Sequence, residues 1–147
     1  MKALDDVTAD IVDAALKIHR KIGPGLLESV YERILAAELS RRGLEVERQK
    51  SIEFDFDGLH FARGFRLDLL VEARVAVEIK AVESLKQIHR AQLLTYLRLI
   101  GCPVGLLVNF GDLTLRNGLV RVVNSLPPSL SHRLEVNRPD PSVRADD

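Results

Sequence analysis

The sequence predicts an α/β protein in which a mixed β-sheet lies between helices. Three observations predict this class. Two helical segments fill the first third of the chain, strand-like segments then follow as two hairpins, and a further helix is succeeded by two apolar strands. Such an order buries the apolar faces of the sheet by packing helices against them.

The first two predicted helices run over residues 7–22 and 26–42. The apolar residues of the first recur every three to four positions: Val7, Ile11, Ala14 or Ala15, Ile18 and Ile22. Gly23-Pro24-Gly25 ends it, because Pro cannot donate the helical hydrogen bond. Glu28 lies in the first turn of the second helix, where an acid complements the positive end of the helix dipole. Gly43 is its predicted left-handed stop.

Two hairpins are predicted next. Apolar and polar residues alternate over residues 46–63, and Asp57-Gly58 is a strong turn signal between the two halves. Residues 66–80 suit two further short strands, with Glu72-Ala73-Arg74 as the turn between them.

The second hairpin carries three charged residues where a small core is normally apolar. Glu78 and Lys80 project from one face of the sheet because side chains alternate, and folding of the hairpin brings Asp68 alongside them. Two carboxylates and an ammonium group are costly to desolvate unless they form ion pairs or coordinate a cation. Two interpretations stay open at this point: a metal site, or an ordinary ion pair on a half-exposed face.

A third helix and two strands complete the prediction. Ser84-Leu85-Lys86-Gln87 matches a capping box, so the helix is expected to begin there and to end near Ile100. Its predicted buried stripe contains Leu85, Ile88, Tyr96 and Leu99. Gln92 falls in that stripe beside His89 and Tyr96, and needs a hydrogen-bond partner in the backbone or in a site. The strands are residues 104–109 and 118–123.

Composition limits the possible classes. Residues 1–125 are expected to form one domain, and residues 126–147 a Pro-rich, poorly ordered tail. Hydrophobic residues at 46% and charged residues at 29% fit a soluble globular protein. No apolar run approaches the roughly 20 residues of a membrane span, and residues 1–10 lack the apolar core of a secretion signal. The single Cys102 forms no internal disulfide, so a cytoplasmic setting without membrane association is expected.

Charge gives no simple indication of a polyanionic partner. Lys plus Arg and Asp plus Glu are equal at 21 each, so a nucleic-acid partner requires local clustering of basic residues. Phosphate-loop, dinucleotide-binding, paired-cysteine and serine-hydrolase motifs are all absent from the sequence.

Residues 25–32, Gly-Leu-Leu-Glu-Ser-Val-Tyr-Glu, resemble the defining motif of the GxxExxY proteins, a bacterial and archaeal group of the PD-(D/E)xK nuclease superfamily. The resemblance covers roughly residues 10–124 and continues through further segments in order: 68–72, 77–81, 92–97 and 105–111. The spacing of Gln92 and Tyr96 is similar to that in RecB-type exonucleases. Leu67 precedes Asp68 where the superfamily pattern has Pro.

The resemblance implies a restriction-endonuclease-like three-layer core of order α-β-β-β-α-β, and a nuclease that uses Mg²⁺ or Mn²⁺. The implied catalytic residues are Asp68, Glu78, Lys80, Gln92, Glu28 and Tyr96. The implied metal ligands are Asp68, Glu78, Glu28 and the carbonyl oxygen of Ile79. Arg66, Lys86, His89 and Arg90 are candidates for contacts with the nucleic-acid backbone.

Two other functions remain open. A nuclease fold without catalysis would bind nucleic acid or a protein partner, and a small phosphate ester is a third possible ligand for such a metal site. The expected partner is nucleic acid, DNA before RNA, and a homodimer is expected by analogy with small nucleases.

Overall fold

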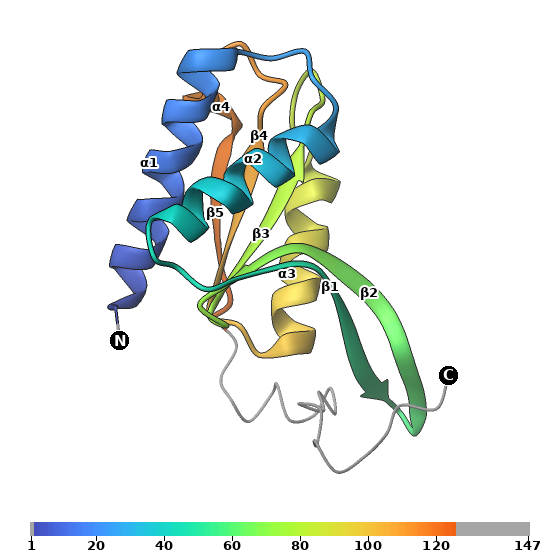
Figure 1. Ribbon diagram of the computed structural model, residues 1–147. Coiled ribbons are helices and arrows are strands. Elements are labelled where there is room, and N and C mark those ends of the chain that lie inside the picture. Colours follow the sequence, from blue (N-terminus) through green and yellow to red (C-terminus); the bar gives the residue numbers. More distant parts are fainter. Residues whose placement is uncertain (1, 126–147) are drawn as a thin grey trace.

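The computed structural model describes residues 2–125, so the prediction made for residues 126–147 lies outside the described residues. The elements, in chain order, are α1 (Leu4–Ile22), α2 (Glu28–Arg41), β1 (Val46–Phe56), β2 (Leu59–Val71), β3 (Val75–Lys80), α3 (Gln87–Ile100), β4 (Val104–Asn109), α4 (Leu115–Gly118) and β5 (Leu119–Val123) (Figure 1). Within residues 2–125, no helix has the length and apolar character needed to cross a membrane.

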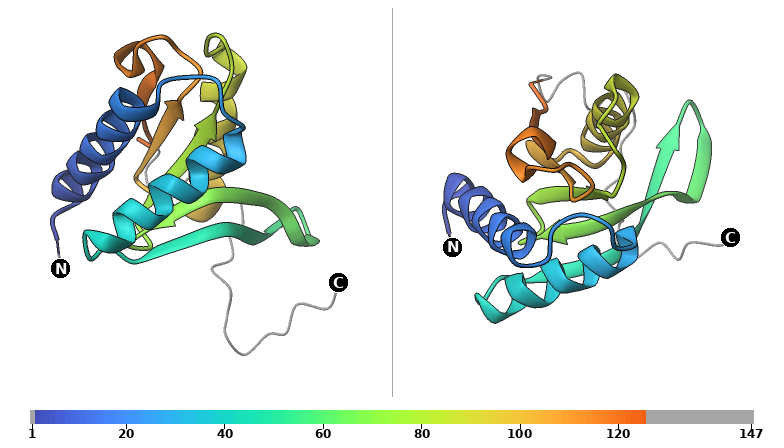
Figure 2. Two further views of the ribbon diagram at one scale, coloured as in Figure 1. Left: turned by 45° about the horizontal axis from the view of Figure 1, so that its top comes forward. Right: turned by 90° about the horizontal axis from the view of Figure 1, so that it is seen from above.

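The five strands form one mixed sheet in the order β1-β2-β3-β4-β5. Strands β1, β2 and β3 are successive antiparallel neighbours, β4 pairs with β3 in parallel after the α3 crossover, and β5 returns antiparallel to β4. Helices α1 and α2 lie on one side of the sheet and α3 lies on the other (Figure 2). The predicted α/β class and the α-β-β-β-α-β order are confirmed, with α1 added at the N-terminal end and α4 and β5 at the C-terminal end.

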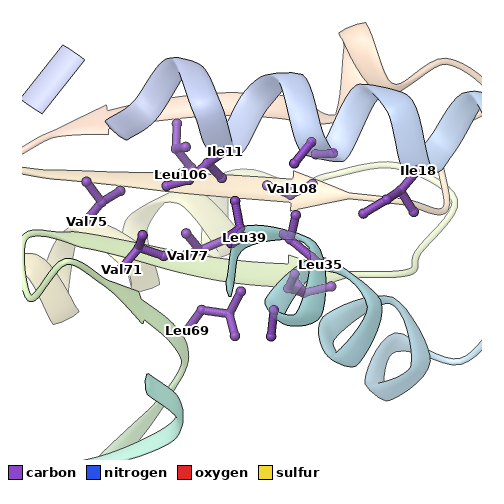
Figure 3. Packing of buried hydrophobic residues seen from close by; sticks show 14 of the residues in the cluster. Ile11, Ile18, Leu35, Leu39, Leu69, Val71, Val75, Val77, Leu106 and Val108 are labelled. Carbon is purple, nitrogen blue, oxygen red and sulfur yellow. The ribbon is translucent and has the colours of Figure 1, made fainter. Parts of the chain in front are cut away.

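The larger hydrophobic core lies between the sheet and the two N-terminal helices. Buried side chains of α1 and α2 pack against alternate residues of the strands, among them Ile11, Leu35, Leu39, Leu69, Val77 and Val108 (Figure 3). A smaller core lies under α3, where Leu93 and Leu97 pack against the other sheet face with Ala76, Leu107 and Val122. Alternate residues of β3 point to opposite sides of the sheet. Because Val77 and Ile79 enter the larger core, Glu78 between them faces the α3 side.

Two predicted helix starts are wrong by up to one turn. Helix α2 begins at Glu28 rather than at Leu26, and α3 begins at Gln87 rather than at the predicted capping box. The backbone N–H of Lys86 donates to Nδ1 of His89 at 3.1 Å. This bond satisfies a backbone donor at the helix end, so Lys86 takes the capping position that the sequence assigned to Ser84.

The predicted buried stripe of α3 is also wrong. Leu93 and Leu97 are fully buried, whereas Ile88 is 68% exposed and Gln92 is exposed. Apolar residues occupy almost every angle around the C-terminal half of this helix, so their periodicity fits two neighbouring stripes equally well. Tyr96, a member of the predicted stripe, is partly buried.

Strands β1 and β2 extend beyond the rest of the described chain as a two-stranded arm, residues 50–66 (Figures 1 and 2). The two predicted turns are confirmed, at Asp57-Gly58 and at residues 72–74. The prediction of two separate hairpins is wrong, because β2 runs unbroken from Leu59 to Val71 and is shared by both turns, so three strands replace the predicted four. An irregularity in the pairing follows Ile52. A Cβ atom added to Gly64 would lie 2.0 Å from the Phe54 ring, so any larger residue at this position would force that ring to move.

The chain leaving β3 is held by the side chain of Asn109, at the end of the parallel neighbour β4. Asn109 is fully buried. Its Oδ1 accepts a hydrogen bond from the N–H of Val82 at 3.0 Å, and its Nδ2 donates to the carbonyl oxygen of Val82 at 2.9 Å and to Asp112 at 2.7 Å. The segment after Lys80 is therefore fixed to the end of β4.

Candidate active site

The site is built where strands β2 and β3 separate. Their backbone pairing ends at Leu69 and Val77. One step further, the N–H of Ile79 donates to Oδ2 of Asp68 at 2.8 Å, and the N–H of Asp68 donates to Oε1 of Glu78 at 3.1 Å. Each carboxylate thus binds a backbone amide of the opposite strand, and the two acids hold the strand ends in a fixed arrangement.

Burial makes this carboxylate pair unusually basic. Glu78 is 7% exposed, and desolvation, followed by the nearby charge of Asp68, raises its pKa to about 8. Desolvation also raises the pKa of Asp68, although the backbone hydrogen bond from Ile79 opposes that effect. In the absence of a cation, the pair therefore holds a proton near neutral pH.

Lys80 and Glu28 complete the charged surroundings. Lys80 is the last residue of β3 and, two residues after Glu78, projects from the same sheet face. Glu28 is the first residue of α2. Desolvation raises the pKa of Glu28, the ammonium group of Lys80 lowers it, and the Asp68 carboxylate raises it further. Glu28, at the N-terminus of α2, is therefore close enough to Lys80 and Asp68 for their charges to change its pKa.

Helix α3, which lies on the sheet face opposite to α2 (Figure 2), contributes Tyr96. Its ring stacks on Phe65 of β2 with a centroid separation of 4.2 Å. Desolvation raises the pKa of the Tyr96 hydroxyl, and the charges of Glu78 and Asp68 add to that shift. Gln92 lies one helical turn before Tyr96 and is exposed. The structure therefore brings Asp68, Glu78, Lys80, Glu28 and Tyr96 into one electrostatic environment, and leaves Gln92 in solvent beside it.

Sequence reasoning did not single out Glu32, which lies one helical turn after Glu28. Its side chain is 4% exposed and forms a 2.9 Å ion pair with Arg48, and Gln49 also donates to it. The charge of Glu32 contributes to the raised pKa of Asp68. An acid four residues after Glu28 on the same helix face was the available signal, but its two partners come from β1 and only the fold brings them there.

Tyr31 explains two positions of the resemblance motif. Its hydroxyl donates to the carbonyl oxygen of Gly23 at 2.6 Å and accepts from the N–H of Leu26 at 3.1 Å. Its ring lies parallel to that of Phe110 at 4.5 Å. Gly25, between these two bonds, has a φ of +118°, which side chains rarely adopt. Tyr31 therefore fixes the loop that places Glu28 at the start of α2.

The predicted backbone-contact residues do not gather at one place. Arg66 is exposed on β2, two residues before Asp68. Lys86 and Arg90 line a groove of about 560 Å³ between α3 and strands β4 and β5, whose lining includes neither Asp68 nor Glu78. His89 caps α3 through the bond from Lys86 described above, so it has a structural role whether or not it contacts phosphate.

The donor atoms of the site suit a hard divalent cation held by two carboxylates. Among residues 2–125, no three His, Cys, Asp or Glu side chains come close enough together to hold a metal ion. The three-carboxylate set predicted from Asp68, Glu78 and Glu28 is therefore not assembled in this structure, and Glu28 as a ligand stays a prediction. Mg²⁺ commonly takes one or two carboxylates and keeps water as its other ligands, and a cation would neutralise the adjacent buried acids.

A mixed sheet between helices, with an aspartate on one strand facing a Glu-x-Lys sequence on the next, is a restriction-endonuclease-like architecture with an acid-rich site. The sequence matches the family described as the PD-(D/E)XK nuclease superfamily over residues 5–122. The chain belongs to that superfamily, whose members usually use a divalent metal ion such as Mg²⁺. No match to the chain was found among curated proteins or among solved structures.

Proposed function

We propose that the protein is a metal-dependent nuclease that hydrolyses phosphodiester bonds of DNA at the Asp68–Glu78 pair. One observation supports this above the others. The carboxylates of buried Glu78 and half-buried Asp68 bind each other's strand through 3.1 and 2.8 Å hydrogen bonds, and Lys80 projects from the same sheet face. A purely structural sheet position gains nothing from two desolvated acids that could be apolar.

In this proposal, Asp68 and Glu78 hold Mg²⁺ or Mn²⁺ through the carboxylate oxygens that their backbone bonds leave available, together with the Ile79 carbonyl oxygen. A bound divalent ion supplies charge neutralisation at the phosphate and eases deprotonation of water. Glu28 accepts a hydrogen bond from a water at the rim of the pair. Its raised pKa suits a role as proton acceptor.

Lys80 places a positive charge on the face where negative charge develops as the phosphodiester bond breaks. Tyr96 and Gln92 orient the attacking water or a substrate phosphate from α3. The stacking of Tyr96 on Phe65 holds its hydroxyl in a fixed direction, whereas exposed Gln92 closes on the substrate as it binds. Arg66 and His89 contact neighbouring phosphates, whereas Lys86 and Arg90 line a groove that includes neither Asp68 nor Glu78 and take no part in these phosphate contacts.

The test is cleavage of linear and circular DNA and RNA, single- and double-stranded, with Mg²⁺, Mn²⁺ or EDTA. We expect cleavage of DNA that EDTA abolishes and that Lys80→Ala and Glu78→Ala each reduce by at least about 100-fold. Lys17→Ala is the matched control, because Lys17 is a surface lysine of α1 paired only with Asp13 among the contacts described for it. Cleavage that survives in both site variants would come from a contaminant.

The same preparation separates the alternatives. Nucleic-acid binding without cleavage under any metal, and without a metal-induced rise in Tm, would leave a non-catalytic binding module. Cleavage of a small phosphodiester with no cleavage of any nucleic acid would favour a small-molecule hydrolase.

A further inference from the structure

The aromatic residues of the chain are concentrated in the arm. Of its five Phe and two Tyr, four Phe lie in β1 and β2, and Tyr96 of α3 stacks on one of them. The ring centroid of Phe54 lies 5.0 Å from that of Phe61 and 6.1 Å from that of Phe65. A ring cluster of this size belongs in the interior of a small protein, and here it lies in a projecting hairpin (Figure 2).

One face of the arm is apolar along its whole length, and only its root is covered. The root residues, Ile52 and Phe65, pack into the smaller core under α3. Toward the tip, Phe56 is 47%, Leu59 61% and Phe61 40% exposed. A two-stranded ribbon is only marginally stable in water when nothing covers its apolar face. The tip therefore lacks a covering surface in the part of the chain that the structure describes.

The charge of the tip argues against nucleic acid as that covering surface. Glu53, Asp55 and Asp57 lie in the outer half of the arm. Two basic residues, His60 and Arg63, lie near these three acids, and His60 pairs with Asp55. Three carboxylates would repel a phosphate backbone. They suit an apolar protein surface with a basic rim.

The chain itself carries such a surface. The groove between α3 and strands β4 and β5 has an apolar floor that includes Leu94, Leu107 and Val120, and Lys86 and Arg90 lie at its edge. It lies on the far side of α3 from Tyr96, where the same protomer's arm packs. An arm cannot fill the groove of its own protomer while Phe65 stacks on Tyr96.

We infer that two copies of this chain exchange arms. The tip residues Phe56, Leu59 and Phe61 of each copy lie in the groove of the other, and Asp57 and its neighbours face Lys86 and Arg90. Two identical contacts related by a two-fold axis close the assembly as a dimer. This dimer requires neither metal nor substrate, so it stands or falls independently of the nuclease activity.

The test is sedimentation of the full chain over a wide range of concentration without metal. We expect a monomer–dimer equilibrium that Leu59→Ser shifts at least about tenfold toward monomer, because it removes an apolar side chain from the contact. Leu113→Ser is the matched control. Leu113 is 88% exposed and lies outside both the arm and the groove. The Leu113→Ser variant should therefore dimerise as tightly as the parent chain.

Charge reversal identifies the contact itself. Asp57→Lys and Arg90→Glu each weaken the dimer, and the double variant recovers it. A distorted turn at Asp57 would not be repaired by a change in α3, so recovery assigns the loss to the pairing. A chain that is monomeric at every concentration overturns the inference, as does a dimer insensitive to Leu59→Ser. A loss of nucleic-acid binding in the arm variants without any dimer would assign the arm to substrate instead.

Discussion

Glu78 has two structural roles with conflicting demands on its charge. Its carboxyl group accepts a backbone hydrogen bond from Asp68, and it lies in an environment that opposes its ionisation. Its pKa is about 8 in the folded chain and about 4.5 in the unfolded chain. Between these values the folded protein holds a proton that the unfolded protein lacks, so stability falls as pH rises through this window.

Glu78→Gln removes this dependence, because the amide accepts the same hydrogen bond without a charge. Below pH 5 the variant and the parent chain should unfold at similar temperatures. By pH 8.5 the metal-free variant should be the more stable by up to about 5 kcal/mol, from about 1.4 kcal/mol per pKa unit over the rise from 4.5 to about 8. Thermal unfolding in EDTA across this pH range measures the difference.

Glu38→Gln is the control for that series. Glu38 is a surface acid of α2 whose pKa is lowered by hydrogen bonds to Arg41 and Arg42. Its folded pKa lies below the unfolded value, so its contribution is present at neutral pH and lost on acidification, the opposite direction. A gap between Glu78→Gln and the parent that stays constant with pH would contradict the buried-acid interpretation.

The site was predictable where a short-range rule determines it. Side-chain alternation alone put Glu78 and Lys80 on one face, and the turn at residues 72–74 fixed the strand carrying Asp68 beside them. Glu32 was not predictable in this way, since its burial depends on Arg48 and Gln49 reaching α2 from β1. The role of Gln92 stays a prediction.

The turn between β2 and β3 is strained because it uses ordinary residues in left-handed conformations. Glu72 and Ala73 both have a φ of +53°. The N–H of Glu72 donates a hydrogen bond to the carbonyl oxygen of Glu45, and the N–H of Glu45 donates to the Glu72 carboxylate. These two bonds link the turn to the residue just before β1. Ala73 has no side-chain hydrogen bond to compensate a conformation that costs about 1–2 kcal/mol for a residue with a Cβ atom.

Ala73→Gly should therefore raise the free energy of unfolding by up to about 1 kcal/mol, since glycine adopts this conformation without strain but loses more entropy on folding. Denaturant unfolding gives the value. Ala62→Gly in β2 is the matched control and should destabilise, because its backbone is already extended. Equal effects of the two changes would rule out relief of turn strain.

Gly64 tests whether the aromatic packing of the arm is tight. Gly64→Ala places a methyl group against the Phe54 ring and should cost about 1–3 kcal/mol, the usual range for overpacking. In a Phe54→Leu background most of that cost should disappear, because the smaller side chain vacates the contact. The free energies of unfolding of the parent chain, the two single variants and the double variant give the coupling energy between the two positions. Additive effects of the two changes would mean that the arm rearranges freely.

The residues at which helices and strands begin and end were the hardest feature to predict from the sequence. The strand at residues 104–109 was predicted to the residue because Pro103 and Gly111 bound an apolar run. The start of α3 was not, because a histidine side chain rather than the expected serine satisfies the helix end. Helix α4 is a single turn whose residues carry no periodicity that a sequence pattern can use.

At the scale of the whole molecule, the proposed metal site would make metal binding and protonation compete for the same two acids. A divalent ion bound at Asp68 and Glu78 must displace the proton held by the pair. The Mg²⁺-induced rise in Tm should therefore grow between pH 6 and pH 8.5 and level off above that. Titration calorimetry in buffers of different ionisation enthalpy should show release of about one proton at pH 7.

The control for this experiment is Asp68→Asn, which keeps the side-chain shape and removes a ligand. It should lose the Mg²⁺ response at every pH. A Tm response to Mg²⁺ that is independent of pH, or that persists in this variant, would place the ion elsewhere on the molecule.

The overall order of elements was predictable because each helix and strand carries its own periodicity and its own stop signal. The contacts between them were not. The order of strands in the sheet follows from which apolar faces meet in the two cores, and the length of the arm depends on pairing that continues past the core to Phe56 and Leu59.

Asn109 has one more effect on the chain that follows β3. Its side-chain amide presents a donor and an acceptor to Val82 just as a peptide group of an adjacent strand would. The sheet is thereby lengthened by one rung in which a side chain substitutes for main chain. The backbone on both sides of Lys80 is therefore held in the sheet, and the lysine's ammonium group changes position through rotation about its own side-chain bonds.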